Sequence, residues 1–224
     1  MKLSFAVHAI LSFYTLFPVL VSAEDLKQDG RAISARSETV QAFLESRRGT
    51  WRDMNVPESD GKILYHLIIE NQYRKALEIG TSTGHSAIWI AWALSRTGGK
   101  LISIEIDEGR YRQALANFKE AGLSEYIDAR LADAHELVKE LKGPFDFVFC
   151  DADKGWYKNY FLDIYPKLEV GGCYTAHNIS GSRWKSWMAR GTREFYEYVK
   201  SLKNMETILD DSGAGLSISF KRTE

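Results

Sequence analysis

The spacing of apolar and polar positions changes several times along the chain, and these changes define the expected elements. Two stretches with apolar residues at helical spacing come first and predict helices over 31–50 and 58–72. From residue 76 onward, short apolar runs alternate with amphipathic stretches. Strands are expected at 76–79, 101–106, 127–131, 145–150 and 168–176, and helices at 86–95, 110–121, 134–141 and 157–165. The tail predicts a helix over 192–200 and two strands, 206–209 and 215–220, close enough together to pair antiparallel.

The regular alternation of strands and helices predicts a doubly wound α/β sheet. The run Phe145–Cys150 is nearly continuous in apolar residues, which is typical of a parallel strand covered on both faces. We therefore expect one domain over 24–224, in which a helical segment of about 31–72 caps an edge of the sheet.

The first 23 residues do not belong to this domain. Lys2 precedes a nearly uncharged apolar run over 3–21, and the run ends in Val21-Ser22-Ala23 before two acids. This pattern is typical of a secretory signal peptide, and the alternative is an uncleaved membrane anchor, since the run is just long enough to span a bilayer. Either interpretation predicts an exported domain, periplasmic, secreted or lumenal, or one anchored in the membrane by this segment alone. A misassigned start would instead make the protein cytoplasmic.

Composition narrows the class of partner. The chain has 224 residues, 45% of them hydrophobic, with 29 Lys and Arg against 30 Asp and Glu. These values are typical of one globular domain and exclude a disordered chain or a coiled coil. A net charge of −1 gives no excess of cations for holding phosphate backbones, so no nucleic-acid partner is expected.

In an open α/β sheet, ligands bind outside the carboxyl ends of the strands, and the loop after the first of these strands is glycine-rich. Gly80 and Gly84 stand where a strand passes into a helix, so the backbone can approach a ligand closely and the helix N–H groups can face it. A plain tight turn is the alternative. The spacing lacks the G-x-G-x-x-G of dinucleotide binding, which makes a nicotinamide-dependent oxidoreductase a distant alternative.

Acids follow the next two strands. Glu105 stands about 25 residues past the first glycine, where a carboxylate could accept both hydrogen bonds of a ribose diol. Asp133 could accept a hydrogen bond from an adenine amino group, but it is also a good N-cap for the following helix.

Together these residues resemble the class I S-adenosylmethionine-dependent methyltransferases, and among them the catechol and caffeoyl-CoA type of O-methyltransferase. The resemblance extends from Asp53 to Lys221 and is carried by Met54–Glu58 with Gly61, Glu78–Ser86, Glu105, Asp133, Asp151–Lys154, Gly171-Gly172 and Gly213–Leu216. It implies a mostly parallel, Rossmann-like sheet of seven strands whose last strand is antiparallel. It also implies methyl transfer to a hydroxyl of a small phenolic or catechol-like acceptor. The alternative is a protein that binds the cofactor but is catalytically silent or independent of metal.

The resemblance also assigns the cofactor site. The methionine part of S-adenosylmethionine would be held by Val56, Glu78, Gly80, Ser82 and Ser86, the ribose by Glu105, and the adenine by Asp133 and Ala134, with Gly84 and Asp151 completing the site. Lys154 would take the proton of the acceptor, a role that requires a lowered pKa because a free lysine is protonated at neutral pH.

At the metal site the chain departs from the family. Asp151 would be a ligand of Mg²⁺ or Mn²⁺, but the Asp-Asn pair that completes the site in the family is His177-Asn178 here. Mg²⁺ prefers hard oxygen ligands, whereas an imidazole nitrogen suits Mn²⁺, Fe²⁺ or Zn²⁺ better. Three interpretations stay open: a retained site with a softer metal, a metal-free site in which His177 is the general base, and a silent histidine that faces solvent.

Two further expectations depend on the resemblance. An aromatic acceptor wall is expected from Trp156, Tyr157, Trp184 and Trp187, although such residues also serve in cores and at dimer contacts. Cys150 and Cys173 lie on strands that the family places side by side, so they are either buried thiols or a disulfide. Dimers are common in that family, so a homodimer is an admissible assembly.

Overall fold

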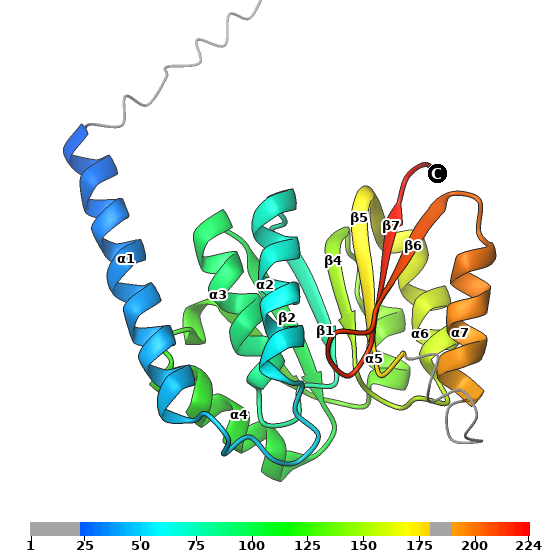
Figure 1. Cartoon of the computed structure of the whole chain (residues 1–224), viewed down its shortest axis with the longest axis horizontal. Coiled ribbons are helices and arrows are strands. Elements are labelled where there is room, and N and C mark those ends of the chain that lie inside the picture. Colours follow the sequence, from blue (N-terminus) through cyan, green and yellow to red (C-terminus); the bar gives the residue numbers. More distant parts are fainter. Residues whose placement is uncertain (1–22, 180–189) are drawn as a thin grey trace, which may run out of the picture.

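The computed structural model describes residues 23–179 and 190–224, and its centre is a seven-stranded sheet with helices on both faces (Figure 1). The strands are β1 (Lys75–Ile79), β2 (Lys100–Glu105), β3 (Ile127–Leu131), β4 (Phe145–Cys150), β5 (Leu168–His177), β6 (Met205–Asp210) and β7 (Leu216–Lys221). Their order in the sheet is β3-β2-β1-β4-β5-β7-β6. Strands β1 to β5 pair in parallel, and β7 runs antiparallel between β5 and β6. The predicted fold is confirmed, including its antiparallel last strand.

Seven α-helices and two short 3₁₀ turns connect the strands within the described ranges. The helices are α1 (Ala23–Ser46), α2 (Glu58–Asn71), α3 (His85–Thr97), α4 (Glu108–Glu120), α5 (Ala134–Glu140), α6 (Tyr157–Ile164) and α7 (Arg190–Ser201), and the 3₁₀ turns are Ser124–Tyr126 and Tyr165–Lys167. Local chemistry sets several of their starts. Pro57 precedes α2 in an extended conformation, and the carboxylates of Asp107 and Asp133 cap α4 and α5 by accepting backbone N–H bonds.

The two faces of the sheet carry separate hydrophobic cores. Phe147 and Phe149 of β4 point toward α1 to α4, whereas Val148 and Cys150 point toward α5 to α7. The expectation that the first helices cap an edge of the sheet is wrong for α2. Its apolar stripe lies over one face, in the same core as Phe147, because an amphipathic helix buries most apolar area against a face.

The N-terminal prediction falls on residues 1–22, which lie outside the described ranges, so the signal peptide or anchor stays a prediction. Over 23–179 and 190–224, no helix combines the length and the apolar character needed to cross a membrane.

The two cysteines are buried free thiols. In the pairing of β4 with β5, Cys173 lies opposite Phe147 and Cys150 lies opposite Ala176. The two side chains also belong to the cores on opposite faces of the sheet, which excludes the disulfide alternative.

Candidate active site

A cavity of about 510 Å³ opens at the carboxyl ends of β1, β2, β4 and β5. It lies where the strand order reverses on either side of β1, which is the usual ligand position in an open α/β sheet. Nine of the residues predicted from the sequence line this cleft: Gly80, Ser82, Glu105, Asp133, Ala134, Asp151, Lys154, His177 and Asn178. The fold therefore brings six of the ten predicted cofactor residues and the candidate catalytic residues into one space.

Gly80 lets the chain turn sharply at the floor of the cleft. Its φ of +95° lies in the region that only glycine adopts readily, and a Cβ there would stand 2.5 Å from the backbone oxygen of Asp151. Two loops that follow adjacent strands therefore approach each other with no side chain between them.

Four predicted cofactor residues do not line the cleft: Val56, Glu78, Gly84 and Ser86. Val56 lies in the wall of a different cavity. Glu78 is completely buried on β1 and accepts a hydrogen bond from Ser103, while its Oε1 has no hydrogen-bond partner among the described residues. Burial raises the pKa of Glu78 to about 8, so this carboxyl group is largely protonated at neutral pH.

Glu105 is fixed by backbone N–H groups. Its Oε2 accepts from Ser82 N at 2.7 Å, and its Oε1 accepts from the N–H groups of Ile106 and Asp107 at 3.0 and 2.9 Å. Three of about four acceptor positions are thus filled, and the free capacity lies on Oε2. Glu105 in this geometry has room for one further hydrogen bond, which is fewer than the two expected for a ribose diol.

Lys154 and Asp151 form an ion pair at one end of the cleft. The Lys154 ammonium donates to Asp151 Oδ1 and, at 2.8 Å, to the hydroxyl of Tyr157. Burial raises the pKa of Tyr157 well above its usual value, so its phenol stays protonated and donates to the backbone oxygen of His177 at 3.2 Å. The lysine amine is therefore held from two sides.

His177, at the end of β5, is enclosed between two carboxylates. Its Nδ1 lies 3.0 Å from Asp151 Oδ2, and its Nε2 lies 2.9 Å from Oδ2 of Asp60, which the first turn of α2 supplies. His177 is 3% exposed and Asp60 is 1% exposed, so solvent does not screen these contacts appreciably. The interpretation of His177 as a silent, solvent-facing residue is wrong, because the ring is buried and bound on both nitrogens.

The charges in this cluster support one another. Burial alone would lower the pKa of His177, but the hydrogen bonds and charges of Asp151 and Asp60 raise it above the ordinary value. Burial likewise opposes ionisation of both acids, yet the contact with His177 lowers the pKa of each. With Lys154 charged, the cluster contains two anions and two cations.

The donor set does not fit a divalent metal ion. Ionised carboxylates only accept hydrogen bonds, so both ring nitrogens of His177 carry a proton and neither has a lone pair for a metal. Both oxygens of Asp151 already accept from cationic groups, so a metal ion bound there would stand beside Lys154 and His177 with only the uncharged Asn178 amide as a further predicted ligand. Within the described ranges, no group of three or more His, Cys, Asp or Glu residues is arranged to hold a metal ion.

Two of the four aromatic residues expected to form an acceptor wall, Trp156 and Tyr157, do not line the cleft. Tyr157 is fully buried, and Trp156 packs edge-on against His135 with ring centroids 4.8 Å apart. His135 also stacks on Tyr160, and these two rings line the part of the cleft beside Asp133. Trp184 and Trp187 lie outside the described residues.

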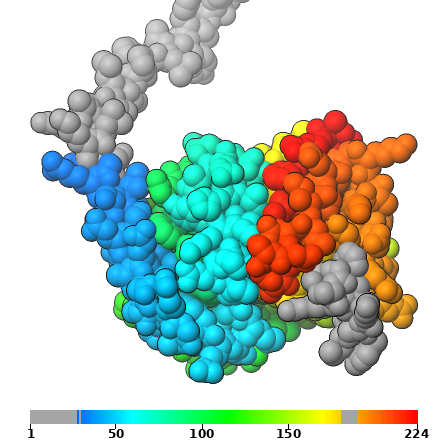
Figure 2. All heavy atoms as spheres, in the orientation of Figure 1, coloured from blue at the N-terminus to red at the C-terminus, as the bar shows by residue number. Residues whose placement is uncertain are grey.

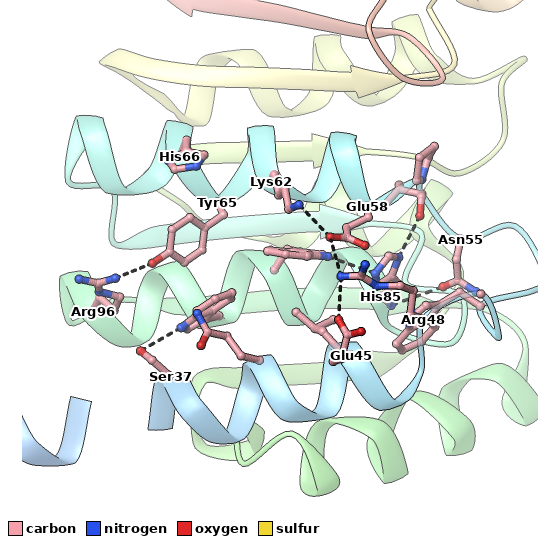
Figure 3. A pocket seen from close by; sticks show the side chains of 18 residues that line it. Ser37, Glu45, Arg48, Asn55, Glu58, Lys62, Tyr65, His66, His85 and Arg96 are labelled. Atoms are coloured by element: carbon pink, nitrogen blue, oxygen red, sulfur yellow. Dashed lines mark hydrogen bonds and ion pairs between the residues drawn. The ribbon is translucent and has the colours of Figure 1, made fainter. Parts of the chain in front are cut away.

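A larger cavity of about 760 Å³ lies between α1, α2 and α3, away from the acid–base cluster (Figure 3). Four charged groups of this α1–α2–α3 cavity pair with one another, since Arg48 binds Glu45 and Glu58 and Lys62 binds Glu58. Arg96 donates instead to the hydroxyl of Tyr65. His85 Nδ1 donates to the backbone oxygen of Val56 at 2.9 Å, and the ring stacks on Trp51. Because Asp151, Lys154 and His177 line the smaller cleft and not this cavity, we assign the chemistry to the smaller cleft.

Asp60 is the main site residue that the sequence reasoning missed. It precedes Leu64 and Ile68 at intervals of four residues and therefore lies on the buried stripe of α2. An acid in phase with an apolar stripe needs a buried partner, and that is the signal that could have found it. The identity of the partner, 117 positions away, follows only from the fold.

The comparisons with known proteins agree with this geometry. A family model described as O-methyltransferase matches residues 34–211. A catechol O-methyltransferase of Niastella koreensis is 39% identical over 156 residues, which are 68% of this chain and 67% of that protein. A caffeoyl-CoA O-methyltransferase of Populus kitakamiensis is 27% identical, with 90% of this chain and 88% of that protein covered.

Solved structures with the same fold include two with a bound cofactor or its product. The O-methyltransferase TomG from Streptomyces achromogenes, in complex with SAM, superposes with a TM-score of 0.69 at 26% identity and covers 88% of this chain and 96% of its own. The O-methyltransferase from Bacillus cereus, in complex with SAH, gives a TM-score of 0.69 at 23% identity, with 91% and 93% covered. At the lower identity the likeness concerns the fold alone.

Proposed function

Since the chain belongs to the O-methyltransferase family, we propose that the cleft beside β1 binds S-adenosylmethionine and that its methyl group passes to a hydroxyl of a small phenolic acceptor. The observation that carries this proposal is the single cleft that joins Glu105 and Asp133 with Asp151, Lys154 and His177. The match to the O-methyltransferase family model excludes the alternative function of a nicotinamide-dependent oxidoreductase.

Within the cleft, the adenosine part belongs at the β2 and β3 side. Glu105 offers its remaining acceptor capacity on Oε2 to a ribose hydroxyl, and the stacked His135 and Tyr160 rings with Ala134 form a flat wall suited to adenine. The sulfonium end then lies toward Gly80 and Asp151, where the backbone approaches most closely. Glu78, whose Oε1 has no partner among the described residues, is buried behind this end.

The reaction is an in-line displacement in which the acceptor oxygen forms a bond to the methyl carbon. Bound S-adenosylmethionine would supply this carbon on its sulfonium group, so the carbon–sulfur bond would break as the new bond forms and its electron pair would leave with a neutral thioether. Lys154 can accept the hydroxyl proton only after its ammonium group has released a proton to solvent, since the uncharged amine can still donate two N–H bonds to Asp151 and Tyr157 while its lone pair is free. Holding the amine from two sides fixes the direction of that lone pair.

The test combines binding with transfer. We expect S-adenosylhomocysteine to bind the wild-type chain in calorimetry, and Glu105→Ala to abolish this binding. The control is Glu108→Ala, which changes an exposed acid three residues further along the chain and should bind S-adenosylhomocysteine as the wild type does. Methylation of a panel of phenols, detected by mass spectrometry, tests the transfer. Binding with no transfer to any acceptor would favour the catalytically silent alternative, and unchanged affinity in Glu105→Ala would refute the site.

A further inference from the structure

The position of His177 has a consequence for the chemistry of the site. In the resembling family the corresponding position supplies a carboxylate to a metal ion, whereas here it supplies a ring that donates to Asp151 and Asp60 from its two nitrogens. A ligand that carries negative charge is thus replaced by a group that carries positive charge. The charge needed beside Asp151 is therefore supplied by the polypeptide itself.

Asp60 is fixed independently of His177. Its Oδ2 accepts from the backbone N–H of Ala214 at 3.0 Å, and its Oδ1 accepts from the Ser59 hydroxyl at 3.1 Å. Its place in the first turn of α2 also favours a negative charge, because helix N–H groups point toward it. Figure 2 shows the C-terminal segment, in red-orange, lying directly against α2, in cyan.

The contact between this segment and Asp60 is close. A Cβ on Gly213 would stand 1.5 Å from Asp60 Oδ1, so only glycine permits the approach. Asp60 does not line the cleft and therefore cannot touch a substrate there. The contact of Asp60 with Nε2 fixes the plane of the His177 ring, so Asp60 is a positioning residue.

We propose that His177, held on both ring nitrogens by Asp151 and Asp60, supplies one positive charge beside Asp151 in place of a divalent cation, so that this site methylates single hydroxyl groups without a metal ion. This inference rests on the function proposed above. A bound cation selects vicinal diols because it coordinates both oxygens, whereas a ring with both nitrogens engaged offers no coordination to either. We therefore expect that a second hydroxyl beside the reacting one does not raise kcat/KM for the acceptor.

The first experiment titrates Mg²⁺ and Mn²⁺ by calorimetry into the full chain saturated with S-adenosylhomocysteine. We expect no saturable binding to the wild type, and a gain of saturable binding in His177→Asp, which restores an oxygen ligand and removes a positive charge. Saturable binding to the wild type that is lost in Asp151→Ala would overturn the proposal. This measurement does not depend on finding an acceptor.

The second experiment compares catechol with phenol as acceptors, with and without EDTA. We expect the rates to be unaffected by EDTA and kcat/KM for the two acceptors to agree within about tenfold, which corresponds to about 1.4 kcal/mol. A rate that EDTA abolishes and Mg²⁺ restores, or transfer to the diol alone, would overturn the proposal. Failure to methylate any acceptor would refute the proposed function instead, and the metal titration would then decide the present inference.

The third experiment tests Asp60 with Asp60→Asn and the matched control Glu58→Gln, an exposed acid two positions earlier on α2. Proton–nitrogen NMR should show both ring nitrogens of His177 protonated at neutral pH in the wild type and in the control, but not in Asp60→Asn. We expect kcat to fall about 10- to 100-fold in Asp60→Asn with unchanged affinity for S-adenosylhomocysteine, as for other residues that orient a catalytic group. A wild-type kcat in Asp60→Asn, or one unprotonated ring nitrogen in the wild type, would overturn the proposal.

Discussion

Arg110 on α4 binds Asp53 through two parallel hydrogen bonds of 2.8 Å. This pair ties the loop before α2 to the rim of the cofactor cleft, which Arg110 and the next loop residue, Met54, both line. Asp53 and Met54 have φ values of +64° and +61°, which non-glycine residues rarely adopt. The ion pair thus holds a strained loop at the mouth of the site.

We expect Arg110→Ala to weaken binding of S-adenosylhomocysteine by about twofold to fivefold, because an exposed bidentate pair contributes modestly. The difference in affinity between the wild type and the variant should become smaller as the salt concentration rises, because salt screens the exposed ion pair of the wild type. Arg112→Ala, which removes an exposed arginine of the same helix paired with Glu108, is the control and should leave affinity unchanged. Equal affinities of all three proteins, measured by calorimetry, would show that the loop does not need this pair.

Gly213→Ala should destabilise the protein. The added Cβ would collide with Asp60 Oδ1, and Asp60 is buried and held by contacts with Ala214 and His177, so relief of the clash must move the loop away from α2. We expect a loss of about 1–3 kcal/mol in the free energy of unfolding, measured by urea denaturation. Gly30→Ala is the control, because a Cβ there meets nothing within 4 Å and alanine favours the helix. A Gly213→Ala variant as stable as the wild type would contradict the described contact.

Glu78 should make the stability of the cofactor-free protein depend on pH. The ordinary pKa of the group is near 4.5, and burial raises it to about 8 in the folded chain. Between these values the folded state binds more protons than the unfolded state, so its stabilisation is complete below the lower value and is lost as pH rises through the upper one. The slope from this one group is at most about 1.4 kcal/mol per pH unit.

Urea denaturation across this pH range, for the wild type and for Glu78→Gln, measures that contribution. Glutamine keeps the shape and cannot ionise, so we expect a shallower decline of stability with rising pH in the variant. Parallel curves for the two proteins would mean that Glu78 does not take up a proton on folding.

The two cysteines should be unreactive in the folded protein. Both thiols are fully buried, and burial raises the pKa of Cys150 to about 12, which suppresses the reactive thiolate. We expect a thiol reagent to label neither cysteine under native conditions and both after denaturation without reductant. Labelling that requires prior reduction would reveal a disulfide and contradict the placement of these residues on opposite faces.

The sequence by itself determined the order of the elements and much of the cleft. The apolar run Phe145–Cys150 and the glycines at 80 and 84 are local signals, and parallel strands place the residues that follow them at one edge of the sheet. Glu105, Asp133, Asp151 and His177 could therefore be predicted to gather there. The departure at His177 was also visible, but three interpretations of it remained.

The tertiary structure removed one of those interpretations, the solvent-facing histidine, because burial and hydrogen bonding depend on contacts across long stretches of chain. Only the fold brings Asp60 to the second nitrogen of His177, and only that contact makes the ring a cation without a free lone pair. The same holds for the cysteines, whose strands are neighbours while their side chains point to opposite faces. Periodicity fixes which elements form, whereas the partner of a buried polar group follows from packing.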